Sequence, residues 1–176
     1  MDRVAERVKA HHDAGADHVC LQVVSGAMGG EMDTVRQSYR DLGVSVAEFP
    51  LNGETAEAAA LAGDDLVLGA PNVVRGGSHN GAIGAEDAVR RGWCSILASD
   101  YYYPAPIQAA FGLIERDVLP LDRAWDLISG APARAAGLKD RGQLATGARA
   151  DIVVIPQGSV HPVLTLVAGK VAYSRL

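Results

Sequence analysis

The stretch Glu54-Thr-Ala-Glu-Ala-Ala-Ala-Leu-Ala-Gly-Asp-Asp-Leu-Val-Leu-Gly-Ala70 decides the fold class of this 176-residue chain. Its first part, 54–62, is rich in alanine and predicts a helix, which Gly63 closes. Its last part, 66–70, is a short apolar run of the kind that forms a buried strand. A helix followed within a few residues by a buried strand is the building block of a parallel α/β sheet.

The same alternation extends on both sides of this stretch. Further strands are predicted at 18–24, 44–49 and 95–99, and further helices at 4–14, 32–42, 86–91, 106–117, 121–129 and 133–136. After Gly142 the pattern changes to short strands without helices, at 151–155 and 163–172. We therefore expect an α/β protein with a partial βα barrel at 1–140 and a small β unit at 141–176.

Four βα units are half of the eight that close a (β/α)₈ barrel, which needs about 200–250 residues or more. A half-barrel has open sheet edges, and open edges must be covered or paired with another chain. The expected fold is therefore half of such a barrel with a small β appendage. It is expected as a fragment, as a homo-oligomer, or together with a complementing chain.

The composition narrows the class of protein. Hydrophobic residues make up 48% and charged residues 21%, with a net charge of −5 and no run of Lys or Arg. This balance argues against a nucleic-acid surface. No secretory signal and no apolar run of roughly 20 residues is present, so a cytoplasmic protein outside the membrane is expected. Cys20 and Cys94 form no C-x-x-C motif and are predicted to be small buried residues.

Asp100 directly follows the predicted strand at 95–99. In parallel α/β folds, functional groups gather where the strands end. A carboxylate beside a buried strand is costly unless it is paired or binds a cation, so Asp100 is a candidate metal ligand or general base. The alternative is that Asp100 only caps the next helix.

A long polar loop is predicted to follow the strand at 66–70. In this loop Arg75 can bind a phosphate with two hydrogen bonds. Gly76, Gly77 and Ser78 would let backbone N–H groups converge on an anion. His79 adds a hydrogen-bond donor or a metal ligand. The alternative is a solvated loop whose glycines only turn the chain.

Glu48 lies near the end of the strand at 44–49, directly before Phe49-Pro50. It is either a carboxylate that supports the site or a solvated charge. Tyr101 begins a run of three tyrosines, which either pack at the mouth of the site or contact a substrate.

Several of these segments together carry a family resemblance. Gly69-Ala-Pro-Asn-Val-Val-Arg-Gly-Gly-Ser-His-Asn-Gly81 resembles a signature of the ribose-methylphosphonate-triphosphate diphosphatase family, within the amidohydrolase superfamily. Ala47-Glu-Phe-Pro50 and Ile96-Leu-Ala-Ser-Asp-Tyr101 are similar to its flanking motifs, in the same order. The stretch from Asp140 to Val154 resembles the C-terminal signature of amidohydrolases, which leads into a small β-sandwich.

The resemblance implies the C-terminal half of a (β/α)₈ metal-dependent hydrolase barrel with a small β-sandwich appendage. It also implies a role in phosphonate metabolism, in the carbon–phosphorus lyase pathway. Such an enzyme releases diphosphate from a triphosphate on a modified ribose and uses a divalent metal, expected here as zinc or manganese. Asp100 matches the aspartate that serves as metal ligand and base, and His79 is its companion ligand. The phosphorylated substrate is expected to bind to Glu48, Asn72, Arg75, Gly76, Gly77, Ser78, His79 and Tyr101.

The chain also departs from the family. The His-x-His motif of the first barrel half is absent, and Ser25-Gly-Ala-Met28 stands where the family has a Ser-His-Asp-Asp-like run. Asn80, Ala82 and Ala131 also differ from the residues that the family pattern predicts. Residues 1–25 are instead similar to luciferase-like deazaflavin oxidoreductases. Three interpretations stay open: a hydrolase of a phosphorylated sugar, a non-catalytic fragment or subunit without the upstream metal ligands, and a deazaflavin oxidoreductase.

Overall fold

The computed structural model describes residues 2–16, 19, 39–77 and 83–176. The chain divides into two compact units, Met1–Ser45 and Val46–Leu176. The first unit contains helix α1, Asp2–Asp13, which confirms the helix predicted at 4–14. The predicted strand at 18–24 and most of the predicted helix at 32–42 lie outside the described residues. The predicted division after residue 140 stays a prediction.

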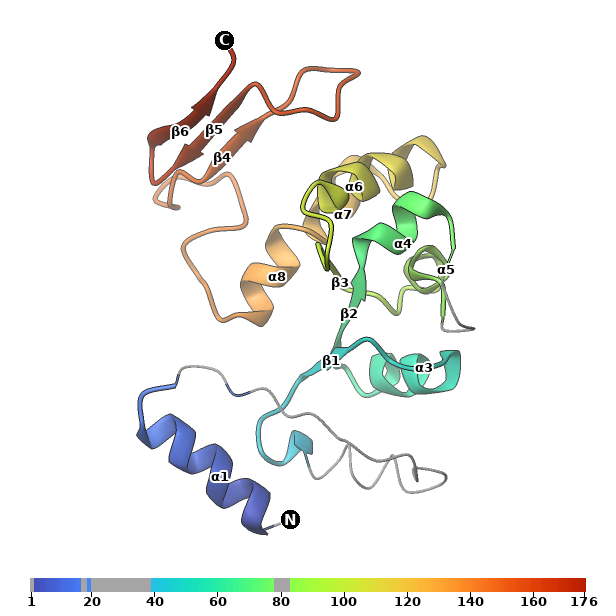
Figure 1. The fold of residues 1–176 in the computed structure, drawn as a ribbon, viewed down its shortest axis with the longest axis vertical. Coiled ribbons are helices and arrows are strands. Elements are labelled where there is room, and N and C mark those ends of the chain that lie inside the picture. Colours follow the sequence, from blue (N-terminus) through green and yellow to red (C-terminus); the bar gives the residue numbers. More distant parts are fainter. Residues whose placement is uncertain (1, 17–18, 20–38, 78–82) are drawn as a thin grey trace. The chain divides into compact units, whose positions relative to one another are not determined.

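A parallel sheet forms the centre of the second unit (Figure 1). Its three strands lie in the order β1-β2-β3: Val46–Glu48, Asp65–Gly69 and Ile96–Ala98. Both strand pairs are parallel, with Glu48 opposite Val67 and Val67 opposite Ile96. The mixed α/β class and the parallel order of these three strands are therefore confirmed. The described residues do not themselves form a closed barrel.

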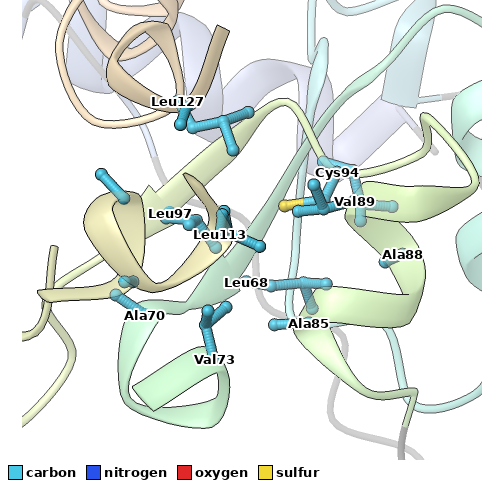
Figure 2. Close-up of a cluster of buried hydrophobic side chains, with 14 of the residues drawn as sticks. Leu68, Ala70, Val73, Ala85, Ala88, Val89, Cys94, Leu97, Leu113 and Leu127 are labelled. Atoms are coloured by element: carbon cyan, nitrogen blue, oxygen red, sulfur yellow. The ribbon is translucent and has the colours of Figure 1, made fainter. Parts of the chain in front are cut away.

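Helices pack on both faces of this sheet. On one face, Leu66, Leu68 and Leu97 join a core with side chains from the helices α3 to α7. These helices span Gly53–Leu61, Ala70–Arg75, Ala85–Arg90, Ala105–Glu115 and Leu121–Asp126. Figure 2 shows Leu68 and Leu97 among the buried side chains of this core. On the other face, Val67 and Ile96 pack against small side chains of helix α8, Gly130–Ala135. The alanines of α8 let it lie close against this second face.

The predicted loop from Pro71 to Gly81 is wrong in its first part, because residues 70–75 form helix α4. Pro71 lies in the first turn, where its missing N–H breaks no helical hydrogen bond. Val73 is completely buried and anchors the helix. Gly76 ends it with a φ of 76°, a left-handed conformation that glycine adopts without strain.

A second, antiparallel sheet follows α8, with strands in the order β4-β5-β6: Ile152–Val154, Leu164–Val167 and Lys170–Ser174. The single run predicted at 163–172 is in fact a hairpin, because Ala168 and Gly169 turn the chain with φ values of 50° and 76°. Asp151 Oδ1 accepts a hydrogen bond of 2.7 Å from Ala168 N–H and thereby supports this turn.

Cys94 is buried, as the sequence predicts, and its thiol donates a hydrogen bond to the Ile96 carbonyl. Burial raises the pKa of this thiol to about 12, so it stays protonated at neutral pH. Cys20 lies outside the described residues. Among the described helices, none combines the length and the apolar character that crossing a membrane requires.

Candidate functional site

The ends of all three parallel strands meet at Gly69, the last residue of β2. A methyl group at the Cβ position of Gly69 would lie 3.3 Å from Asp100 Oδ2 and 3.3 Å from Phe49 Cε1. Phe49 directly follows β1, and Asp100 lies two residues after β3. The carboxylate and the aromatic ring therefore both lie against the bare Cα of Gly69 at the carboxyl end of the sheet.

Asp100 lies in a turn and does not cap a helix. Its φ is 54°, and the turn is closed by a hydrogen bond of 3.0 Å from Tyr102 N–H to the Ser99 carbonyl. Helix α6 begins after Pro104, which makes no side-chain capping bond, so the capping alternative is wrong. Asp100 is exposed, so the desolvation argument for a bound cation does not apply to it.

Three predicted substrate-binding residues lie together next to this turn. Arg75 Nη2 donates a hydrogen bond of 3.0 Å to Asn72 Oδ1. The guanidinium carbon of Arg75 lies 5.7 Å from the ring centroid of Tyr101, within the range of a cation–π contact. Helix α4 and the turn after β3 thus hold the guanidinium beside the residue that follows Asp100.

The predicted anion nest at Gly76 and Gly77 is wrong, because both N–H groups donate to the Asn72 carbonyl and cap helix α4. Amides that already donate to a carbonyl are not available to an anion. Ser78 and His79 lie outside the described residues, so their predicted roles stay predictions.

Glu48 is exposed at the end of β1, in keeping with a solvated charge. A cavity of about 320 Å³ adjoins Asn72 and the glycines that follow α4. Glu86, Asp87 and Arg116 also line it, and Glu86 accepts hydrogen bonds from Arg90 and Arg116. The lining therefore carries charges of both signs.

The family resemblance implies a divalent metal, which requires a suitable set of ligands. Within residues 2–16, 19, 39–77 and 83–176, no three His, Cys, Asp or Glu side chains come close enough to hold one ion. Asp100 supplies one carboxylate, whereas a catalytic zinc usually has three protein ligands. The described residues therefore do not form a complete metal site, and we assign no chemical step to a metal.

Phe49 and Gly69 were not identified as site residues from the sequence. A glycine in an otherwise apolar strand is a signal of close approach by another group. That signal was present at Gly69, although nothing in the sequence shows that the approaching groups are Phe49 and Asp100.

Comparison with known proteins identifies the family to which the chain is similar. The model of the amidohydrolase family matches residues 77–173. The alpha-D-ribose 1-methylphosphonate 5-triphosphate diphosphatase of Escherichia coli (strain K12) is 40% identical over 129 residues. The match covers 72% of this chain and 34% of that protein, so the chain spans about a third of the length of this relative.

Proposed function

This chain belongs to the amidohydrolase family, and we propose that it provides part of the active site of a hydrolase that releases diphosphate from a triphosphorylated sugar. The reaction and the substrate class come from the name of the Escherichia coli relative. The observation that carries the proposal is the position of the Asp100 carboxylate at the carboxyl end of β2, beside the Arg75–Tyr101 contact.

The proposed chemistry divides between two side chains. The Asp100 carboxylate would orient the attacking water and accept its proton, since a positioned carboxylate is a competent general base. Arg75 would bind phosphate oxygens with the guanidinium N–H groups that do not donate to Asn72. The Tyr101 ring supports Arg75 through the cation–π contact, and Asn72 fixes the direction of one of its donors.

Members of the superfamily generally use divalent metals. We propose zinc or manganese, with Asp100 and His79 as ligands from this chain and Glu48 and Ser78 nearby. The remaining ligands would come from residues outside the described ones, from a second copy, or from a complementing chain. We also propose that β1–β3 belong to the C-terminal half of a (β/α)₈ barrel and that residues 141–176 belong to a β-sandwich. A phosphorylated substrate favours a cytoplasmic location.

A second candidate function is a non-catalytic subunit or fragment that binds polyphosphate. The ligand count favours it, because the described residues hold no group of three possible metal ligands. The Arg75 contacts need only helix α4 and the turn after β3, so anion binding does not depend on a complete metal site. The resemblance of residues 1–25 to deazaflavin oxidoreductases stays a prediction.

Diphosphate release and inorganic tripolyphosphate binding by the purified chain, with added zinc or manganese, separate the two functions. We expect slow release or none from the chain alone, and tripolyphosphate binding that salt weakens. Arg75→Ala should abolish that binding. Arg91→Ala is the matched control, because Arg91 also stacks on an aromatic ring, that of Trp93 at 4.8 Å, away from the proposed site.

The outcomes of these measurements separate the hydrolase from the non-catalytic subunit. Turnover that falls about 100-fold or more in Asp100→Asn would support the hydrolase. Tripolyphosphate binding that is lost in Arg75→Ala, without turnover even when a complementing chain is added, would favour the non-catalytic subunit. A chain that neither binds tripolyphosphate nor releases diphosphate would contradict both functions.

A further inference from the structure

Each outer strand of the parallel sheet is followed by a residue in the left-handed backbone region. Phe49, after β1, has a φ of 50°, and Asp100, after β3, has a φ of 54°. Aspartate enters this region more readily than most residues, but for a bulky residue such as phenylalanine it is a true outlier. Such conformations persist only where the surrounding structure enforces them, and they are concentrated at functional sites.

The middle strand ends between these two residues in Gly69. The backbone of Gly69 has a φ of −75° and a ψ of 121°, an ordinary extended conformation that any residue adopts. Backbone geometry therefore does not require glycine at this position. Space favours glycine, because a Cβ there would lie 3.3 Å from both Asp100 Oδ2 and Phe49 Cε1, so these side chains would have to shift by a few tenths of an ångström.

Backbone hydrogen bonds hold both neighbours in place over Gly69. Phe49 N–H donates to the Val67 carbonyl at 3.0 Å, which extends the pairing of β1 with β2 by one residue. The turn at Asp100 is closed by the bond from Tyr102 N–H to the Ser99 carbonyl. Phe49 is 40% exposed and belongs to neither of the two core clusters.

We propose that Gly69 and Phe49 are positioning residues for the Asp100 carboxylate. Gly69 leaves the space in which the carboxylate lies against the strand, and the Phe49 ring borders the same space. Together they limit the directions that the carboxylate adopts. The catalytic meaning of this inference rests on the proposed function, whereas the contact itself is testable without activity.

The first test is a double-mutant cycle in thermal unfolding, with Gly69→Ala and Asp100→Gly singly and combined. In the wild-type background, crowding by the Asp100 carboxylate offsets the entropic gain that alanine usually brings over glycine. In the Asp100→Gly background that crowding is gone. Gly69→Ala should then shift the unfolding midpoint upward by about 2 °C more than it does in the wild type.

Gly53→Ala is the matched control, because a Cβ at Gly53 meets nothing within 4 Å. It should shift the midpoint equally in both backgrounds. Equal shifts for Gly69→Ala in the two backgrounds would overturn the inference, whether or not the chain hydrolyses its substrate.

The second test is the split between kcat and KM in the chain with zinc or manganese and any complementing chain it requires. Gly69→Ala and Phe49→Leu should each lower kcat about 10- to 100-fold and leave KM within about twofold, since small misplacements of a reacting group are costly. Gly53→Ala should change neither. Adding Gly69→Ala to Asp100→Asn should cause no further loss.

An unchanged kcat in Gly69→Ala would overturn the positioning role even if the unfolding cycle shows coupling. A wild-type chain without any turnover would instead contradict the proposed hydrolase. The unfolding cycle would then still decide whether Gly69 controls the position of Asp100.

Discussion

The parallel and antiparallel sheets have three short strands each but differ in burial. In the parallel sheet, Leu66 is completely buried and Leu68 and Leu97 are 3% exposed, because helices pack on both faces. In the antiparallel sheet the described residues 151–176 include no buried residue, and Val171 is 65% exposed. Backbone pairing therefore defines both sheets, whereas the hydrophobic core stabilises only the parallel one.

The antiparallel sheet relies on local contacts instead. Asp151 Oδ1 bonds to Ala168 N–H, and the Ala150 carbonyl accepts from Gly169 N–H at 2.9 Å. Both bonds hold the β5–β6 turn against the start of β4. Substitutions in the two sheets should therefore affect stability through different mechanisms, and by different amounts.

The largest expected effect comes from truncating a leucine in each sheet. Leu66→Ala should lower the free energy of unfolding by about 2–5 kcal/mol, since it leaves a cavity in the core. Leu166→Ala, in β5, is the matched control and should cost about 1 kcal/mol or less, because its side chain is only partly buried. Urea unfolding measures both, and equal losses would contradict the contrast between the sheets.

The next largest effect is expected at Gly142, which follows α8 and packs against it. Gly142 has a φ of 86°, and a Cβ there would lie 2.9 Å from Ala133 Cβ and 3.0 Å from Gly130 Cα. Gly142→Ala should cost about 2–4 kcal/mol through backbone strain and overpacking against α8. Gly147 is the matched control, because it has a φ of 87° but no atom near its Cβ position. An alanine there therefore introduces the backbone strain without the overpacking.

Gly147→Ala should cost only about 1 kcal/mol in the same urea unfolding experiment. If the two alanine variants are equally destabilised, the close contact of Gly142 with α8 contributes nothing to stability.

Sequence patterns predicted the strands that packing makes apolar and missed the features that depend on distant residues. The runs at 66–70 and 95–99 predicted β2 and β3 closely, since burial from both sides requires continuous apolar side chains. Helix α4 was missed because its six residues are too few for a helical repeat and glycines follow directly. The hairpin at Ala168 was missed because alanine is an unusual residue at a positive φ.

The candidate site, like the fold, was predictable from the sequence only in part. Position at a strand end correctly placed Asp100 at the carboxyl edge of the sheet. The anion nest at Gly76 and Gly77 failed, because glycine-rich sequence is equally typical of a helix C-terminus. The contact of Gly69 with Phe49 and Asp100 joins three strands, and no local sequence pattern encodes it.

A smaller effect, and a gain, is expected in the turn of the antiparallel sheet. Ala168→Asn should stabilise β5 and β6 by about 0.5–1 kcal/mol, because Asn-Gly suits a two-residue turn with positive φ at both positions. Amide hydrogen exchange of β5 and β6 should slow accordingly. Ala145→Asn, at an exposed position without positive φ, is the control and should leave exchange unchanged.

The smallest effect concerns the ion pair that joins α7 to α8. The Asp126 carboxylate accepts two hydrogen bonds from Arg134, at 3.0 and 2.6 Å. These bonds hold the pKa of Asp126 below its ordinary value. The Arg134 and Asp126 side chains are 66% and 38% exposed, so solvent screens the pair, and Asp126→Asn should cost about 0.5 kcal/mol at pH 7.

The pH dependence follows from the direction of that shift. A carboxyl group with a lowered folded-state pKa stabilises the fold above its unfolded-state pKa of about 3.9 and loses this contribution as pH falls through the folded-state value. The difference between Asp126→Asn and the wild type should therefore be constant from pH 7 to about pH 5, shrink below about pH 4, and decrease with added salt. Glu57→Gln, at an exposed position on α3, should show no comparable loss at pH 7. Urea unfolding at each pH measures the difference, and a difference that grows as the solution is acidified would show that Arg134 does not lower the pKa of Asp126.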